Sequence, residues 1–153
     1  MANSVSQVLL TEGRLDAPNE DVRHGESVHW RIDPGAGAVL DFWGVVRELE
    51  DGRKIEGIDY EAHKAMAEHQ MKVIADAAAE TFRLNQVVLH HRVGFVRTGE
   101  ASLFLRVSAQ HRAAAFEASK WIVDELKKKV PIWKKPRFKT NEQPRTASAA
   151  SAR

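Results

Sequence analysis

The pattern of apolar and polar positions predicts four strands along the chain. Residues 37–46 form a continuous apolar run, typical of a buried strand, in which Gly44 indicates a bulge or a close backbone approach. Residues 55–60 alternate in polarity, and the Asp51-Gly52 turn before them predicts a hairpin with the preceding strand. Two further strands are expected at residues 87–91 and 101–107.

Two segments have the period of amphipathic helices. The first covers residues 63–82, and the second covers 110–128, with Ser108 as a candidate N-cap and Pro131 beyond its end. The apolar side of the second helix contains Ala115, Ala118, Ser119, Ile122 and Leu126. The order β-β-α-β-β-α predicts an α+β domain with a mainly antiparallel sheet and helices packed on one face.

Length and composition indicate one globular domain. Of the 153 residues we assign 1–138 to this domain, and we expect the Ser/Ala-rich, non-periodic residues 139–153 to be a disordered tail. Residues 1–36 are weakly patterned. There is no cysteine, which excludes a disulfide framework, a thiolate metal site and a cysteine nucleophile. We see no secretory signal and no membrane-spanning apolar stretch, so a cytoplasmic location is expected.

The charge is unevenly distributed. Residues 1–119 contain 13 Lys/Arg and 18 Asp/Glu, a balance of −5, whereas residues 120–139 contain eight Lys/Arg and only Asp124 and Glu125, a balance of +6. Such a local concentration of positive charge attracts an anionic partner to one place. A phosphate, a carboxylate terminus, an acidic protein surface or a nucleic acid would each fit.

The second helix carries basic residues at both ends. His111 and Arg112 lie at its start, where free backbone N–H groups favour anions and Arg adds a bidentate donor, although a surface His-Arg pair without a ligand fits the same pattern. Lys127 lies in its last turn, where it either caps the helix or, if neutral, acts as a base or nucleophile. Other lysines nearby disfavour its charged form.

Further basic residues follow the helix. Lys134 comes after Pro131-Ile132-Trp133, which can fix its position, although a lysine on a protective edge strand fits the same pattern. Lys135, Arg137 and Arg47, at the end of the first strand, are further candidates for binding a charged substrate. The histidines show no metal-ligand spacing, so we expect neither a metal nor a cofactor. We interpret His90-His91 as structural, with one ring on each face of a strand.

With these residues in place, the chain resembles the catalytic (large) subunit family of molybdopterin synthase. The matching stretches cover about 100 residues in order and at family spacing. They include residues 37–47, Tyr60-Glu61-Ala62-His63, His91-Arg92-Val93-Gly94, 108–118, 124–127 and Pro131-Ile132-Trp133-Lys134-Lys135.

The resemblance implies a hammerhead-type α/β fold and a homodimer within a heterotetramer. Each subunit would bind a small ubiquitin-like sulfur carrier, whose Gly-Gly tail ends in a thiocarboxylate and delivers sulfur to cyclic pyranopterin monophosphate. Lys127 and Lys134 match the family's catalytic lysines. Arg47, His111 and Arg112 match its pocket residues for the pterin phosphate and the carrier tail. A transferase without cysteine must receive its sulfur on a partner, which agrees with this scheme.

One departure and two alternatives accompany the resemblance. Pro136 stands where the family usually has an acidic residue, which puts the placement of Lys134 in doubt. The interleaved cations and aromatic residues of 127–139 also fit a nucleic-acid-binding module, although the rest of the chain is acidic. A catalytically inactive scaffold that binds the carrier is the second alternative, and retention of Lys127 and Lys134 argues against it.

Overall fold

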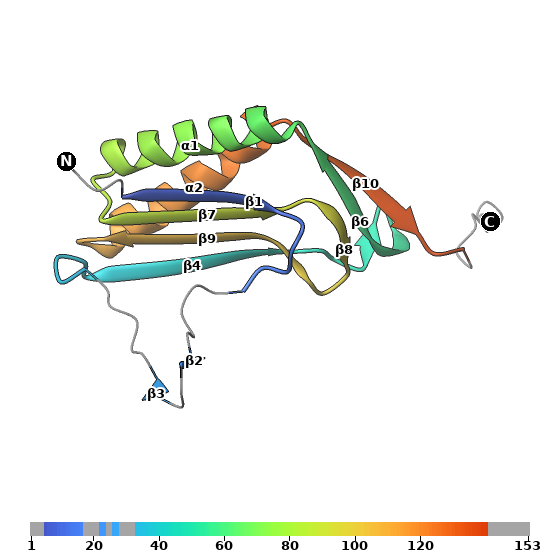
Figure 1. Ribbon diagram of the computed structural model, residues 1–153, viewed down its shortest axis with the longest axis horizontal. Coiled ribbons are helices and arrows are strands. Elements are labelled where there is room, and N and C mark those ends of the chain that lie inside the picture. Colours follow the sequence, from blue (N-terminus) through green and yellow to red (C-terminus); the bar gives the residue numbers. More distant parts are fainter. Residues whose placement is uncertain (1–4, 17–21, 24–25, 28–32, 141–153) are drawn as a thin grey trace.

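A four-stranded sheet in the order β1-β7-β9-β4 forms the centre of the molecule (Figure 1). The structure is a computed structural model that describes residues 5–16, 22–23, 26–27 and 33–140. The strands are β1 (Ser6–Thr11), β4 (Ala38–Val45), β7 (Gln86–Arg92) and β9 (Ala101–Ala109). β1 pairs with β7 in parallel, and the other two pairs are antiparallel.

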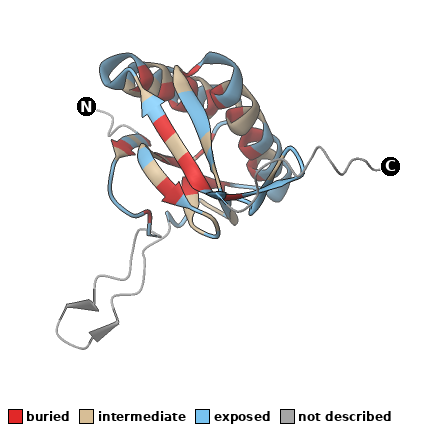
Figure 2. Ribbon diagram, turned by 90° about the vertical axis from the view of Figure 1, so that its right-hand side faces the viewer, coloured by how far each residue is buried: buried red, intermediate tan, exposed pale blue. Residues whose placement is uncertain are grey.

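Two helices cover one face of this sheet, α1 (Lys64–Thr81) and α2 (Arg112–Lys129) (Figure 1). Their inward sides carry the buried residues, and their outward sides are exposed (Figure 2). Met71 and Ile122 from the helices meet Leu89 and Leu105 from the sheet in the main core. Each such side chain stabilises the fold by about 1.5–3 kcal/mol through burial.

A second, smaller sheet lies at one end of the first (Figure 1). Its long strand β6 (Arg53–Ala62) pairs with β5 (Leu49–Glu50), β8 (Gly94–Arg97) and β10 (Ile132–Phe138), all antiparallel. A separate small core holds it together and contains Val46, Ile55, Ile58, Tyr60 and Val96. The short strands β2 (Val22–Arg23) and β3 (Glu26–Ser27) pair with each other.

Most of the predicted elements are confirmed, and so is the α+β class. Both helices are present within two residues of their predicted bounds, and both pack on one sheet face. The predicted turn is present, with positive φ angles at Asp51 and Gly52 (52° and 75°). At Gly44 the register shifts, and a Cβ there would lie 3.1 Å from the Cβ of Leu103, so both expectations for this glycine hold.

Two expectations about this framework were wrong. β6 forms its hairpin with β5 rather than with β4, which pairs with β9 instead, because alternation predicts a strand but not its partner. Ser108 is a buried residue of β9, and the N-cap of α2 is His111, which makes no side-chain capping bond. The alternative that Lys134 lies on an edge strand is confirmed, because it belongs to β10, which includes Pro136 paired opposite Ile58 without a break in register up to Arg137.

β10 is an edge strand of the smaller sheet, where a missing N–H is tolerated. Lys134 therefore has a regular strand position, opposite Tyr60, despite Pro136. β10 ends at Phe138, and residues 141–153 lie outside the described part of the chain, so the disordered tail stays a prediction.

Across the described residues, no helix is long and apolar enough to cross a membrane. The same part of the chain holds no group of three or more His, Asp or Glu side chains arranged to bind a metal ion.

Candidate active site

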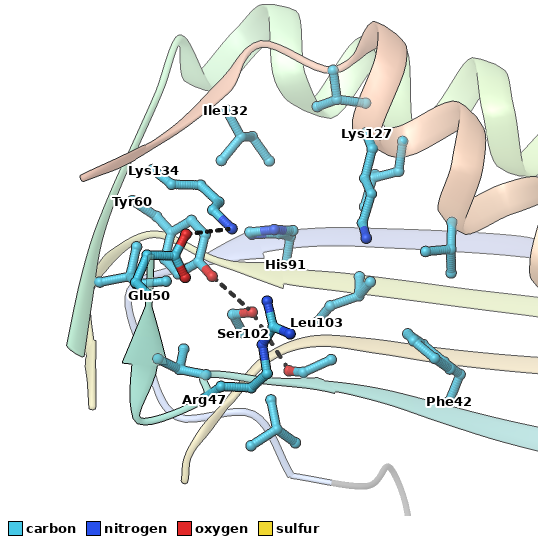
Figure 3. Close-up of a pocket in the computed structure, with 17 residues that line it drawn as sticks. Phe42, Arg47, Glu50, Tyr60, His91, Ser102, Leu103, Lys127, Ile132 and Lys134 are labelled. Atoms are coloured by element: carbon cyan, nitrogen blue, oxygen red, sulfur yellow. Dashed lines mark hydrogen bonds and ion pairs between the residues drawn. The ribbon is translucent and has the colours of Figure 1, made fainter. Parts of the chain in front are cut away.

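A cleft of about 630 Å³ lies where the two sheets meet the C-terminal end of α2 (Figure 3). Residues from β4, β5, β6, β7, β9, α2 and β10 line it, so the cleft exists only in the folded chain. Its polar and charged lining residues are Arg47, Glu50, Tyr60, His91, Ser102, Lys127 and Lys134. Apolar side chains, among them Phe42, Leu103 and Ile132, complete the walls.

The two candidate catalytic lysines reach the cleft from adjoining elements. Lys127 lies in the last turn of α2, and Lys134 lies on β10 after the short Val130-Pro131 connection. Both side chains project into the cleft (Figure 3). Within the described residues, the ammonium of Lys127 has no hydrogen bond or salt bridge, whereas that of Lys134 lies 3.9 Å from a carboxylate oxygen of Glu50.

The cleft has a net positive charge. Arg47 follows β4 and approaches from the side opposite to Lys127 (Figure 3), so the lining contains three cations. Glu50 contributes the one carboxylate among the lining residues, and its side chain is 21% exposed. An anion is attracted to such a site.

The floor of the cleft is polar but uncharged. Tyr60 donates a hydrogen bond to Ser102 (3.3 Å), and the Ser102 hydroxyl donates to the Gly44 carbonyl (3.5 Å). The His91 ring stacks edge-on against Tyr60, with 5.3 Å between ring centroids, and its Nδ1 lies 2.8 Å from the Arg92 carbonyl. Burial raises the pKa of Tyr60 and lowers that of His91, so both groups are neutral near pH 7.

Four of the predicted site residues lie outside this cleft. His111 and Arg112 are exposed at the opposite end of α2, roughly 22 Å from Lys127 at 1.5 Å per residue. Lys135 and Arg137 point away from Lys134 because side chains alternate along a strand. Lys135 pairs with Glu61 (3.7 Å), and Arg137 pairs with Asp59 (2.9 Å).

Sequence reasoning missed several residues of the cleft. His91 was interpreted as structural, yet it lines the floor, while His90 lies on the other face of the sheet beside Phe104. Tyr60 and Glu50 were not considered as site residues. The expectation that the two rings lie on opposite faces of a strand is confirmed, but no signal in the sequence gives the register that brings Tyr60 opposite Lys134.

Comparison with known proteins gives a consistent result. A family model described as MoaE protein matches residues 17–129. The molybdopterin synthase catalytic subunit of Pyrococcus abyssi is 40% identical over 116 residues, which are 76% of this chain and 78% of that protein.

Two solved structures are similar as well. The crystal structure of molybdopterin synthase from Staphylococcus aureus matches with a TM-score of 0.67 and 34% identity, covering 71% of this chain and 80% of that one. A complex of subunits 1 and 2 of molybdopterin-converting factor from Helicobacter pylori matches with a TM-score of 0.57 and 23% identity, covering 71% and 75%, which supports the fold alone.

The family match covers most of the chain, and it includes β4, α2 and His91, which all contribute to the lining of the cleft. Lys134 and the rest of β10 follow directly after the matched residues. By sequence, fold and cleft, the chain belongs to the MoaE family of molybdopterin synthase catalytic subunits.

Proposed function

We propose that this chain transfers sulfur from the thiocarboxylate of a small carrier protein to cyclic pyranopterin monophosphate, which forms the dithiolene of molybdopterin. The observation that carries the proposal is the convergence of Lys127, Lys134 and Arg47 on one cleft of about 630 Å³. A cleft of this size accommodates a small phosphorylated heterocycle, and its charge suits an anionic substrate and an anionic tail.

The two lysines have different environments and therefore different roles. Within the described residues, the ammonium of Lys127 makes no hydrogen bond or salt bridge, and it projects into the cleft, so it is available to a ligand. We assign it as the base or as the transient acyl acceptor for the thiocarboxylate carbon. Lys134, whose ammonium lies 3.9 Å from Glu50, stabilises the oxyanion that develops when a nucleophile adds to the carrier's thiocarboxylate carbon, before the C–S bond breaks and the carbonyl re-forms.

Assembly with other chains is part of the proposal. The similar structure from Helicobacter pylori contains two different subunits, which supports a small carrier as partner. His111 and Arg112 lie too far from the cleft of their own chain to bind its ligand, so their proposed role in substrate binding requires a second copy. A homodimer within a heterotetramer satisfies this requirement. We place this assembly in the cytoplasm.

Neither alternative function is supported. The basic stretch 127–139 is not a continuous positive surface, because carboxylates pair with four of its cations. These are Lys129 with Glu125, Lys134 with Glu50, Lys135 with Glu61, and Arg137 with Asp59. A nucleic-acid-binding surface requires cations that are available to phosphates. An inactive scaffold has no need for two lysines that project into a cleft.

Reconstituted turnover tests the function. The protein is mixed with thiocarboxylated carrier and cyclic pyranopterin monophosphate, and product is measured as the oxidised fluorescent derivative of molybdopterin. We expect Lys127→Ala to abolish product while its circular dichroism spectrum is unchanged. Lys128→Ala is the matched control, because Lys128 is exposed on the same helix and does not line the cleft. Full activity in Lys127→Ala would refute the assigned role.

A further inference from the structure

The polar groups on the cleft floor all have their protons engaged within the protein. The Tyr60 hydroxyl donates to Ser102, the Ser102 hydroxyl donates to the Gly44 carbonyl, and the His91 ring lies against the Arg92 carbonyl. A carbonyl oxygen only accepts, so Nδ1 of His91 must carry the ring proton. The hydroxyl oxygens of Tyr60 and Ser102 and Nε2 of His91 therefore offer lone pairs to a ligand in the cleft, as hydrogen-bond acceptors.

His91 is the clearest of these acceptors. The residue is 7% exposed, and desolvation by burial lowers its pKa, so the ring is neutral and Nε2 carries a lone pair. The charged groups around the cleft are Arg47 after β4, Glu50 of β5, Lys127 of α2 and Lys134 of β10, with Arg92 next to His91 on β7. Three of the four lining groups are cations, and Glu50 is the one carboxylate among them.

We propose that Tyr60, His91 and Ser102 form a donor-reading subsite, which binds the N–H and O–H edge of the substrate, while Arg47, Lys127 and Lys134 bind its anionic end. This inference rests on the proposed function and specifies which part of the substrate lies where. The fitting ligand is a planar heterocycle with neighbouring N–H or NH₂ donors and a phosphate at the other end. A heterocycle that presents only acceptors would place lone pair against lone pair and would bind poorly.

Two substitutions at His91 distinguish the role of its Nδ1 donor from that of its Nε2 acceptor. Asn places an amide N–H near the Nδ1 position and can keep the bond to the Arg92 carbonyl, but it loses the acceptor at Nε2. Gln reaches the Nε2 position with its amide oxygen. His90→Asn is the matched control, since the neighbouring ring lies beside Phe104 on the opposite face. Ser102→Ala is a second route, because it removes one acceptor and releases the Tyr60 proton.

Binding is measured by calorimetry without oxygen, with cyclic pyranopterin monophosphate and inorganic phosphate as separate ligands. We expect His91→Asn to weaken pterin binding about 5- to 10-fold, as for the loss of one hydrogen bond, and to leave phosphate binding unchanged. His91→Gln should recover part of the loss, and His90→Asn should match the wild type. Ser102→Ala should weaken pterin binding and leave phosphate binding unchanged. This variant tests the subsite if His91→Asn does not fold.

Other results would overturn the subsite. These are pterin binding unchanged in both His91→Asn and Ser102→Ala, equal losses for pterin and phosphate, an equal loss in His90→Asn, or no pterin binding by the wild type. Turnover is measured in parallel on the wild type. Binding that follows the expected pattern without any product would refute the proposed sulfur transfer and leave the subsite in place.

Discussion

Glu50 is the carboxylate in a cleft that is otherwise suited to anions, and replacing it with glutamine should strengthen phosphate binding. The carboxylate lies 3.9 Å from the ammonium of Lys134, so a phosphate held by that lysine would lie near it as well. Glutamine keeps the size of the side chain and removes the charge. The cleft lining then changes from three cations and one anion to three cations alone.

The magnitude follows from Coulomb's law. A phosphate on Lys134 would place its phosphorus about 7 Å from the Glu50 carboxylate, and the 53% exposure of the Lys134 side chain calls for strong solvent screening. At an effective dielectric constant of roughly 40 to 80, the repulsion is about 0.6–1.2 kcal/mol per charge. Glu50→Gln should therefore bind inorganic phosphate about 3- to 8-fold more tightly, and the gain should shrink as salt is added.

The assay is calorimetry with inorganic phosphate at low and high ionic strength. Glu61→Gln is the matched control, because Glu61 lies at a similar distance (3.7 Å) from Lys135 but outside the cleft. Phosphate affinity that is unchanged or lower in Glu50→Gln, or raised equally in Glu61→Gln, would show that the cleft does not bind the anion beside Lys134.

Two further predictions concern stability, measured by urea unfolding. Burial lowers the pKa of His90 and His91 below their ordinary 6.5, so the unfolded chain binds protons more tightly and stability should fall as pH drops below about 6.5. His91→Asn should reduce this loss, and a pH-independent stability would contradict it. Ile122→Ala, at a fully buried position in α2, should cost about 2–4 kcal/mol, and a loss under about 1 kcal/mol would contradict the packing described.

The sequence predicted those features that depend on neighbours along the chain. The apolar side of α2, the bulge at Gly44 and the Asp51-Gly52 turn each rest on a local pattern, and each is present. Lys127, Lys134 and Arg47 were candidates from their places at the end of a helix or strand, and the family resemblance implied their roles. The structure places all three in one cleft, and their roles stay a proposal.

The features that were missed depend on tertiary pairing. An edge strand at Lys134 was only one of two interpretations, since Trp133-Lys134-Lys135-Pro136 shows no alternation. An edge strand over a small core needs few apolar residues. The floor of the cleft draws Tyr60, His91 and Ser102 from three strands far apart in sequence. Their meeting depends on strand order and register, which side-chain patterns do not specify.

The direct passage from α2 into β10 limits how this family member can change in length. Lys127 and Lys134 are seven residues apart, and the chain between them leaves the helix at Val130 and enters the strand at Ile132. Insertion or deletion of one residue there would turn every following side chain to the other face of the strand. Trp133 or Lys135 would then occupy the place of Lys134. Substitutions in this connection can be tolerated, whereas a change in its length removes a cation from the cleft in a single step.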